Sequence, residues 1–173
     1  MRSALKREKK LLKVPLCLKG KVIKGFQRGS KEIGVPTANL SLEELGEAFP
    51  HDCATGIFAG WAKLAKSKEI HKMVMSVGWN PFYKNTKKTV EPHLMHKFEK
   101  DFYGEELRLV VTCFIRPEAD FESLEALVEA IHADIKFTDG LLEESEHRKF
   151  KSHRFLEGDE GETAAVAASE DDE

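Results

Sequence analysis

The sequence predicts a mainly β protein, an antiparallel barrel or sandwich, because short strand-like segments follow one another without helical patterns between them. β-branched, aromatic and small residues are concentrated in short runs, which is typical of strands. Turn-forming residues separate the runs, as in Gly-Trp-Asn-Pro at 78–81 and Tyr-Gly-Glu at 103–105. The predicted strands cover residues 14–18, 56–64, 71–77 and 107–115.

A change of period near residue 121 predicts one amphipathic helix that packs on the β domain. Apolar residues recur there every three or four positions, as expected of a helix with one buried face. These residues are Phe121, Leu124, Val128, Ile131 and Ile135. Asp120 is expected to cap the N-terminus of this helix. Residues 141–156 have a weaker helical pattern that does not indicate a role.

Both ends of the chain are predicted to lie outside the domain. Residues 1–13 are basic and lack the apolar stretch of a secretion signal, so they are interpreted as a solvated tail. Residues 157–173 are acidic, contain no aromatic residue and are expected to be disordered. Residues 14–156 then form the barrel and its C-terminal helices. We expect removal of residues 1–12 and 158–173 to change activity by no more than a few fold.

Composition and charge argue against several classes of function. The net charge is −3, from 27 basic and 30 acidic residues, which gives no electrostatic case for nucleic-acid binding. No apolar run approaches the ~20 residues of a membrane helix. The three cysteines form no CxxC or Cys/His metal spacing, which is typical of reduced thiols in a cytosolic protein. We therefore expect a cytoplasmic monomer with no nucleic-acid or membrane partner.

Residues 20–40, GKVIKGFQRGSKEIGVPTANL, are the most informative segment. Four glycines allow turns and let backbone N–H groups approach phosphate oxygens. No Lys-Ser or Lys-Thr follows a G-x-x-x-x-G run, and G-x-G-x-x-G is absent, so the Walker A and dinucleotide-binding motifs are excluded. Simple turns in a β-rich domain and phosphate binding both stay open.

Thr37 and Asn39 follow these glycines and are two positions apart, so they face the same side of an extended backbone. A hydroxyl and an amide carbonyl are hard oxygen donors that suit a Mg²⁺ whose other ligands are water and phosphate. The two residues could equally close a turn after Pro36. The spacing alone does not choose between a metal site and a turn.

Glu91 stands before Pro92 in a strand-like run within residues 76–107. An ordinary solvated glutamate is the simplest interpretation of such a residue. His93 and His96 lie three residues apart, but without an HExxH motif they do not indicate a zinc site.

These segments together resemble the riboflavin kinase (flavokinase) family, in particular its eukaryotic monofunctional branch. The matching runs, in family order over about residues 15–136, are GKVIKGFxRGSK, GVPTAN, TGIFAGWA, HKMVMSVGWNPFYKNTKKTVEPHLMH, DFYGEEL and FIRPExxFxSLEAL. The resemblance implies a six-stranded antiparallel Greek-key barrel with a C-terminal helix packed on it. It also implies transfer of the γ-phosphate of ATP to the 5′-hydroxyl of riboflavin, giving FMN and ADP.

The resemblance implies roles for individual residues as well. Glu91 matches the family's catalytic carboxylate, which activates the ribityl hydroxyl. Thr37 and Asn39 match the positions that hold MgATP, with Zn²⁺ and Mn²⁺ as alternative metals. The other implied nucleotide-site residues are Gly25, Lys31, Leu94, His96 and Tyr103. The implied flavin contacts are Arg116, Ala119 and Phe121, although many family members carry a larger polar residue at the position of Ala119.

Two other functions stay open for the same barrel. A flavin or nucleotide carrier without turnover would need neither a base at Glu91 nor a metal site at Thr37 and Asn39. An oligonucleotide-binding barrel is the second alternative, and the net charge argues against it. A bifunctional enzyme that also makes FAD is rejected, because the chain is too short for an adenylyltransferase domain.

Overall fold

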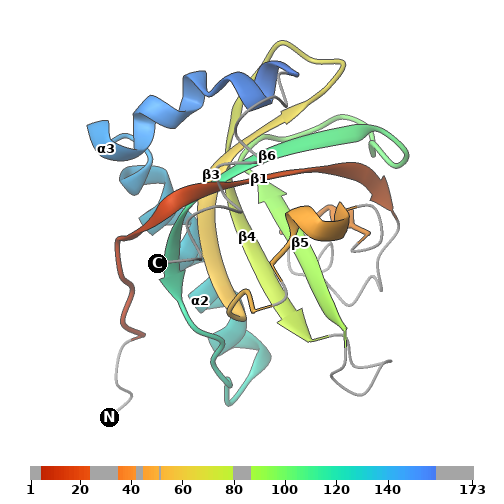
Figure 1. The fold of residues 1–173 in the computed structure, drawn as a ribbon. Coiled ribbons are helices and arrows are strands. Elements are labelled where there is room, and N and C mark those ends of the chain that lie inside the picture. Colours follow the sequence, from red (N-terminus) through yellow and green to blue (C-terminus); the bar gives the residue numbers. More distant parts are fainter. Residues whose placement is uncertain (1–4, 24–34, 42–44, 51, 80–86, 159–173) are drawn as a thin grey trace.

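The computed structural model describes residues 5–23, 35–41, 45–50, 52–79 and 87–158 (Figure 1). The strands in this part of the chain form a closed antiparallel barrel in the order β1-β2-β5-β4-β3-β6. Their bounds are Lys10–Ile23 for β1, Asn39–Leu40 for β2, Gly56–Leu64 for β3, His71–Trp79 for β4, Lys88–Leu94 for β5 and Glu106–Arg116 for β6. The prediction of a six-stranded antiparallel barrel is confirmed.

The predicted strands all lie within observed ones, and β3 has the predicted bounds. β2 was missed because it spans only two residues, and β5 was recognised only as a strand-like run around Glu91 because it contains a proline. Pro92 cannot donate a ladder hydrogen bond, which disfavours it inside a sheet. It is tolerated because its backbone nitrogen and carbonyl point toward the residues beside the short strand β2. The Pro92 carbonyl still accepts a hydrogen bond there, from Ala38 N at 2.8 Å.

Alternating residues of the strands divide the core into two clusters. Residues that point into the barrel include Leu18, Met73, Val90 and Leu109, all fully buried or nearly so. The second cluster lies on the outer face of β3 and β6 and includes Trp61, Cys113 and Ile115.

The C-terminal segment covers this outer cluster, which gives residues 141–156 the role that their pattern did not indicate. It contains α3 (Ser145–Arg148) and the 3₁₀ turns η3 (Lys149–Ser152) and η4 (Arg154–Glu157). Leu142, Phe155 and Leu156 pack into the outer cluster. The indole Nε1 of Trp61 donates a hydrogen bond to the His147 carbonyl at 3.0 Å.

The predicted helix is present as α2 (Leu124–Leu141), and it packs against β4 (Figure 1). Its predicted cap was wrong. The N-cap is Ser123, whose hydroxyl accepts a hydrogen bond from Ala126 N, three residues along the chain. Asp120 lies three residues before this cap and cannot reach the first free N–H groups of the helix.

The packed face of α2 also differs from the predicted apolar stripe. Leu124 is 66% exposed, whereas Asp134 and Thr138 are buried on the face toward the barrel. The barrel presents the Arg116 guanidinium to this face, and it forms an ion pair with Asp134 at 2.8 Å. A buried charge therefore sets the rotation of the helix, and a pattern of apolar residues cannot show this. Among the described residues, no helix has both the length and the apolarity to cross a membrane.

The basic segment predicted as a solvated tail is partly built into the fold, which corrects the boundary at residue 14. Lys10 and Leu11 pair with β6 as the start of β1. Glu8 N donates to the Ile115 carbonyl at 2.7 Å. Arg7 donates to Asp134 Oδ1 at 2.8 Å and to the Ala130 carbonyl at 3.1 Å. Composition hides these contacts because the partners lie far along the chain.

We expect deletion of residues 1–12 to lower the free energy of unfolding by at least about 2 kcal/mol, since hydrogen bonds to charged groups contribute ~1.5–3 kcal/mol each. This replaces the expectation that the segment is dispensable. Urea unfolding measures the effect, and deletion of residues 159–173 is the control. Equal stability of the two truncated proteins would show that the ion pair of Arg7 contributes nothing.

Candidate active site

Glu91 lies on the outer face of the barrel, between β2 and β4. Its neighbours Val90 and Pro92 point inward and are buried, so the alternation of β5 turns the Glu91 carboxylate outward. Glu91 is opposite Ser76 of β4, and Thr89 is opposite Gly78. The side chain of Glu91 is half-buried.

Three polar side chains converge on this carboxylate. Thr37 Oγ1 lies 3.5 Å and Asn39 Nδ2 lies 3.4 Å from the same oxygen, Glu91 Oε1. Thr89 Oγ1 lies 3.4 Å from the other oxygen, Oε2. The contacts are long for hydrogen bonds, so these groups can be rearranged at little cost when a ligand enters.

Thr37 and Asn39 face the same side, as their spacing predicts. Ala38 and Leu40 between and beside them are buried, and Leu40 pairs with Val90 of β5. The segment is also held at Pro36, whose carbonyl accepts a hydrogen bond from His93 Nδ1 at 2.7 Å. The pKa of His93 is lowered, chiefly by burial, although the hydrogen bond to Pro36 raises it in part.

A cavity of about 690 Å³ lies next to this group of side chains. Thr37 belongs both to the cavity wall and to the contacts of Glu91. Leu94, His96 and Tyr103, which the resemblance assigned to a nucleotide, line the same cavity. Its volume lies within the range of small-molecule sites. Lys97 and Lys100 also line it, and sequence reasoning did not single them out. The remaining predicted nucleotide residues, Gly25 and Lys31, lie outside the described residues.

The predicted flavin residues lie elsewhere, where β6 leads into α2. Arg116 is 4% exposed, and its guanidinium holds both oxygens of Asp134 at 2.9 and 2.8 Å. It also donates to the Pro117 carbonyl at 3.1 Å and lies 5.8 Å from the Phe121 ring centre. The Arg116 side chain is thus occupied inside the protein, while Ala119 and Phe121 are half-buried in the segment that it anchors.

Glu118 brings a second carboxylate to the outer face of β4 and β5. A Cβ atom at Gly78 would lie 3.0 Å from Glu118 Oε1 and 3.8 Å from Thr89 Oγ1. The segment around Ala119 therefore passes over the face that carries Glu91, and the absence of a side chain at Gly78 leaves room for it. Sequence reasoning missed Glu118, because one glutamate after a proline carries no signal of its own.

Comparison with known proteins agrees with this architecture. A family model described as flavokinase, riboflavin kinase, matches residues 12–142. The chain belongs to the riboflavin kinase family. The riboflavin kinase of Homo sapiens is 48% identical over 144 residues, which cover 83% of this chain and 92% of that protein. A bifunctional riboflavin kinase/FMN phosphatase of Arabidopsis thaliana is 49% identical over 142 residues, 82% of this chain and 37% of that protein.

The riboflavin kinase fold is confirmed by a solved structure. The crystal structure of riboflavin kinase from Trypanosoma brucei superimposes with a TM-score of 0.67 at 31% sequence identity, covering 84% of this chain and 90% of that one. The predicted resemblance, with its barrel and C-terminal helix, is therefore correct.

For a member of the riboflavin kinase family, the arrangement has a clear chemical capacity. A half-buried carboxylate can accept a proton from an alcohol held against it. A hydroxyl and an amide beside that carboxylate offer oxygen ligands to a cation that accompanies phosphates. An adjoining cavity with apolar, aromatic and cationic walls can hold a nucleotide next to both.

Proposed function

We propose that this member of the riboflavin kinase family transfers the γ-phosphate of ATP to the 5′-hydroxyl of riboflavin, giving FMN and ADP. The proposal rests on one observation above all: Thr37 contacts the Glu91 carboxylate and also lines the 690 Å³ cavity. Reactants held at these two places would meet near Thr37, as phosphoryl transfer requires.

ATP would occupy the cavity. Leu94 and the aromatic residues His96 and Tyr103 suit a base, while Lys97 and Lys100 supply positive charge for phosphates. Gly25 and Lys31 are proposed to complete the phosphate site, on the strength of the family resemblance. Positioning and charge neutralisation dominate phosphoryl transfer, so these residues act mainly by holding the phosphates in line with the attacking hydroxyl.

A divalent metal accompanies ATP in kinases, and Thr37 and Asn39 fit a role in holding it. Both approach the same oxygen of Glu91, so their own side-chain atoms lie close together. Asn39 directs its Nδ2 toward the carboxylate, which turns the amide oxygen away from it and makes that oxygen available to a cation. Mg²⁺ suits these hard donors, with Mn²⁺ and Zn²⁺ as alternatives. When bound, the metal neutralises phosphate charge.

Glu91 is proposed as the general base. Its carboxylate would accept the proton of the ribityl 5′-hydroxyl as that oxygen gains bonding to phosphorus. The proton leaves late in a loose transition state, when the hydroxyl has become acidic, so a carboxylate is basic enough. Thr89 and Asn39 orient the two carboxylate oxygens.

Riboflavin is proposed to lie against the segment after β6, in contact with Ala119 and Phe121. Arg116 would then act from behind this segment, because its guanidinium is bound to Asp134 and the Pro117 carbonyl. This refines the role that the resemblance implies for Arg116, from a direct side-chain contact to a positioning residue.

A direct assay tests the function. Purified protein is incubated with riboflavin and ATP, together with Mg²⁺, Mn²⁺ or Zn²⁺, and FMN is measured by chromatography. FMN formation that depends on both ATP and a metal is expected. Binding of riboflavin or ATP without any FMN would instead show a carrier and overturn the proposal.

Asn39→Ala is expected to raise the metal and ATP concentrations needed for half-maximal rate by at least about 10-fold, the equivalent of losing a contact to a charged group worth ~1.5 kcal/mol. Riboflavin affinity should change little. Steady-state titrations of ATP and metal measure the effect. Thr89→Val is the matched control, since Thr89 also contacts Glu91 but is not assigned to the metal. Unchanged metal dependence in folded Asn39→Ala would refute the assignment.

We also propose that the protein acts as a monomer in the reducing cytoplasm. Its three cysteines, Cys17, Cys53 and Cys113, form no disulfide, and two of them are buried. Burial raises the pKa of Cys113 to about 11, which keeps it protonated and unreactive. Size-exclusion chromatography with light scattering tests the monomer, and a dimer mass would contradict it.

A further inference from the structure

Two histidines face each other where β4 begins and β5 ends. The ladder pairs Met73 with Leu94. Met95 N donates to the Lys72 carbonyl at 2.9 Å, and the next step of the same register places His71 opposite His96. Directly opposed residues of an antiparallel pair have neighbouring Cβ atoms. The two imidazole ring centres are 4.6 Å apart with their planes 33° from parallel.

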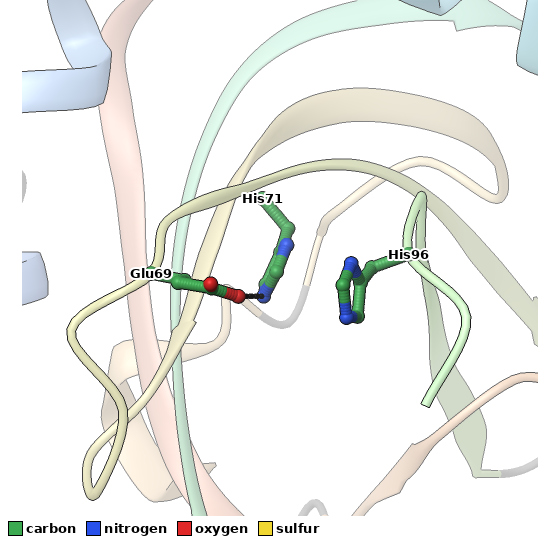
Figure 2. A group of neighbouring side chains, drawn as sticks. All are labelled: Glu69, His71 and His96. Carbon is green, nitrogen blue, oxygen red and sulfur yellow. Dashed lines mark ion pairs between the residues drawn. The ribbon is translucent and has the colours of Figure 1, made fainter. Parts of the chain in front are cut away.

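Glu69 completes a group of three with these histidines. Its Oε2 lies 3.9 Å from His71 Nε2. One potential ligand atom from each of Glu69, His71 and His96 lies within 4.8 Å of the other two. Figure 2 shows the three side chains directed toward one another, Glu69 and His71 from one continuous segment and His96 from another.

The surroundings are apolar on one side and open on the other. Phe98 packs edge-on against both imidazoles, with its ring centre 5.4 Å from that of His71 and 4.7 Å from that of His96. His71 is only 9% exposed, whereas Glu69 and His96 are exposed. The pKa of His71 is lowered by burial first and then by His96 and Lys151, against an opposing effect of Glu69. A ring nitrogen of His71 is placed to offer its lone pair to a metal ion on the open side.

We propose that Glu69, His71 and His96 form a binding site for a divalent transition-metal ion of the zinc class, separate from Thr37 and Asn39. Two imidazoles and one carboxylate are a preferred ligand set for such an ion, with water in a fourth position. Mg²⁺ is disfavoured here because it selects oxygen ligands. The apolar Phe98 wall limits water on the buried side of the site.

The geometry needs only a small closure. Metal–ligand distances of about 2.0–2.1 Å place the ligands of a tetrahedral zinc ion about 3.3 Å apart. The three atoms now lie within 4.8 Å of one another, and the exposed side chains of Glu69 and His96 can rotate to close the difference. His71 stays in place as the buried anchor.

Metal binding would involve the nucleotide cavity, because His96 also lines it. A metal ion that draws His96 toward His71 removes His96 from the cavity wall, so the metal ion and the nucleotide base should compete. By linkage, each would weaken the other by the same factor. This coupling rests on the proposed function, whereas the metal site itself does not.

The metal site is tested on the full chain without nucleotide. Zn²⁺ affinity is measured by competition with a chromophoric chelator, and Co²⁺ is added as a probe whose visible absorption reports tetrahedral coordination. We expect one ion per chain. His71→Gln and His96→Gln should each weaken Zn²⁺ binding by at least ~10–100-fold. Losing a residue that only supports a metal ligand already has this cost, and losing a ligand should not cost less. Glu69→Gln should weaken it by about 10-fold.

His132→Gln is the matched control, since His132 is an exposed histidine of α2 outside the group of three. The Zn²⁺ affinity of the His132→Gln protein should equal that of the wild type. His71 is buried, so urea unfolding checks its variant, and the exposed Glu69 and His96 variants keep the test decisive if that variant fails to fold. No stoichiometric binding, or binding that survives in His96→Gln, would overturn the site and leave the three residues as a packing cluster.

Adenosine tests the coupling, because it carries no phosphate to chelate the metal. Saturating adenosine should weaken Zn²⁺ binding several-fold in the wild type. An unchanged Zn²⁺ affinity in the presence of bound adenosine would overturn the competition. It would leave the metal site itself to be judged from the Zn²⁺ affinities of the Glu69, His71 and His96 variants. Failure of the nucleotide assignment would appear separately, as an absence of adenosine binding.

Discussion

Glu91→Gln is expected to lower the turnover number by roughly 10²–10⁴, the usual contribution of general-base catalysis. The 5′-hydroxyl of riboflavin is a poor nucleophile, and its proton needs an acceptor as the P–O bond forms. Glutamine keeps the size of the side chain but cannot take that proton. Affinities for riboflavin and ATP should stay close to those of the wild type, so the loss should fall on the turnover number in steady-state kinetics.

Two other glutamates make this test specific. Glu99→Gln should cost little, because Glu99 is exposed and is not among the residues that line the cavity. Glu118 is the stronger competitor, since its carboxylate approaches the same face of the barrel near Gly78 and Thr89. A large loss in Glu118→Gln with little loss in Glu91→Gln would move the base to Glu118.

A folded Glu91→Gln protein that retained more than about a tenth of the wild-type turnover would show that Glu91 is not the base, because that loss lies below the ~10² expected of one. If Glu118→Gln were equally active, the proton would have to pass to the phosphate itself. Glu91 would then serve only to orient the hydroxyl.

Asp134→Asn is expected to lower the free energy of unfolding by about 3–5 kcal/mol, the usual cost of removing one partner of a buried ion pair. The Asp134 carboxylate is 3% exposed and lies within 2.8 Å of both Arg7 and Arg116. Without its charge, the guanidinium of Arg116 stays buried with no counter-ion. Urea or thermal unfolding followed by circular dichroism measures the change.

Arg7→Gln is the matched control and should cost less than Asp134→Asn. The Arg7 side chain is 15% exposed, and its loss leaves the ion pair of Arg116 with Asp134 intact. Equal losses in the two variants would show that the pair of Arg116 with Asp134 contributes nothing beyond the contact of Arg7. If Arg116 positions the flavin segment, Asp134→Asn should also raise the KM for riboflavin more than the KM for ATP.

The sequence alone determined the class of fold and most of its elements. β3 has the predicted bounds, and β4 and β6 extend the predicted segments by one or two residues at an end, because strands have a regular side-chain period that burial imposes. The helix predicted from Phe121 to Ile135 is shifted along the chain, since α2 runs from Leu124 to Leu141. Thr37 and Asn39 were also placed correctly on one side of the chain, since their spacing follows from the geometry of an extended backbone. The family resemblance directed attention to Glu91, which no local pattern distinguishes from a surface glutamate.

Only the tertiary structure decided which distant residues meet. Arg7 and Asp134 are 127 positions apart, and their ion pair both draws the N-terminal segment into the fold and turns a charged face of α2 toward the barrel. Barrel closure and strand register likewise determine that Glu118 approaches Gly78 and that His71 faces His96. Periodicity reports whether a residue is buried near its sequence neighbours. It carries no information about charges and ligands that come together only when the barrel closes.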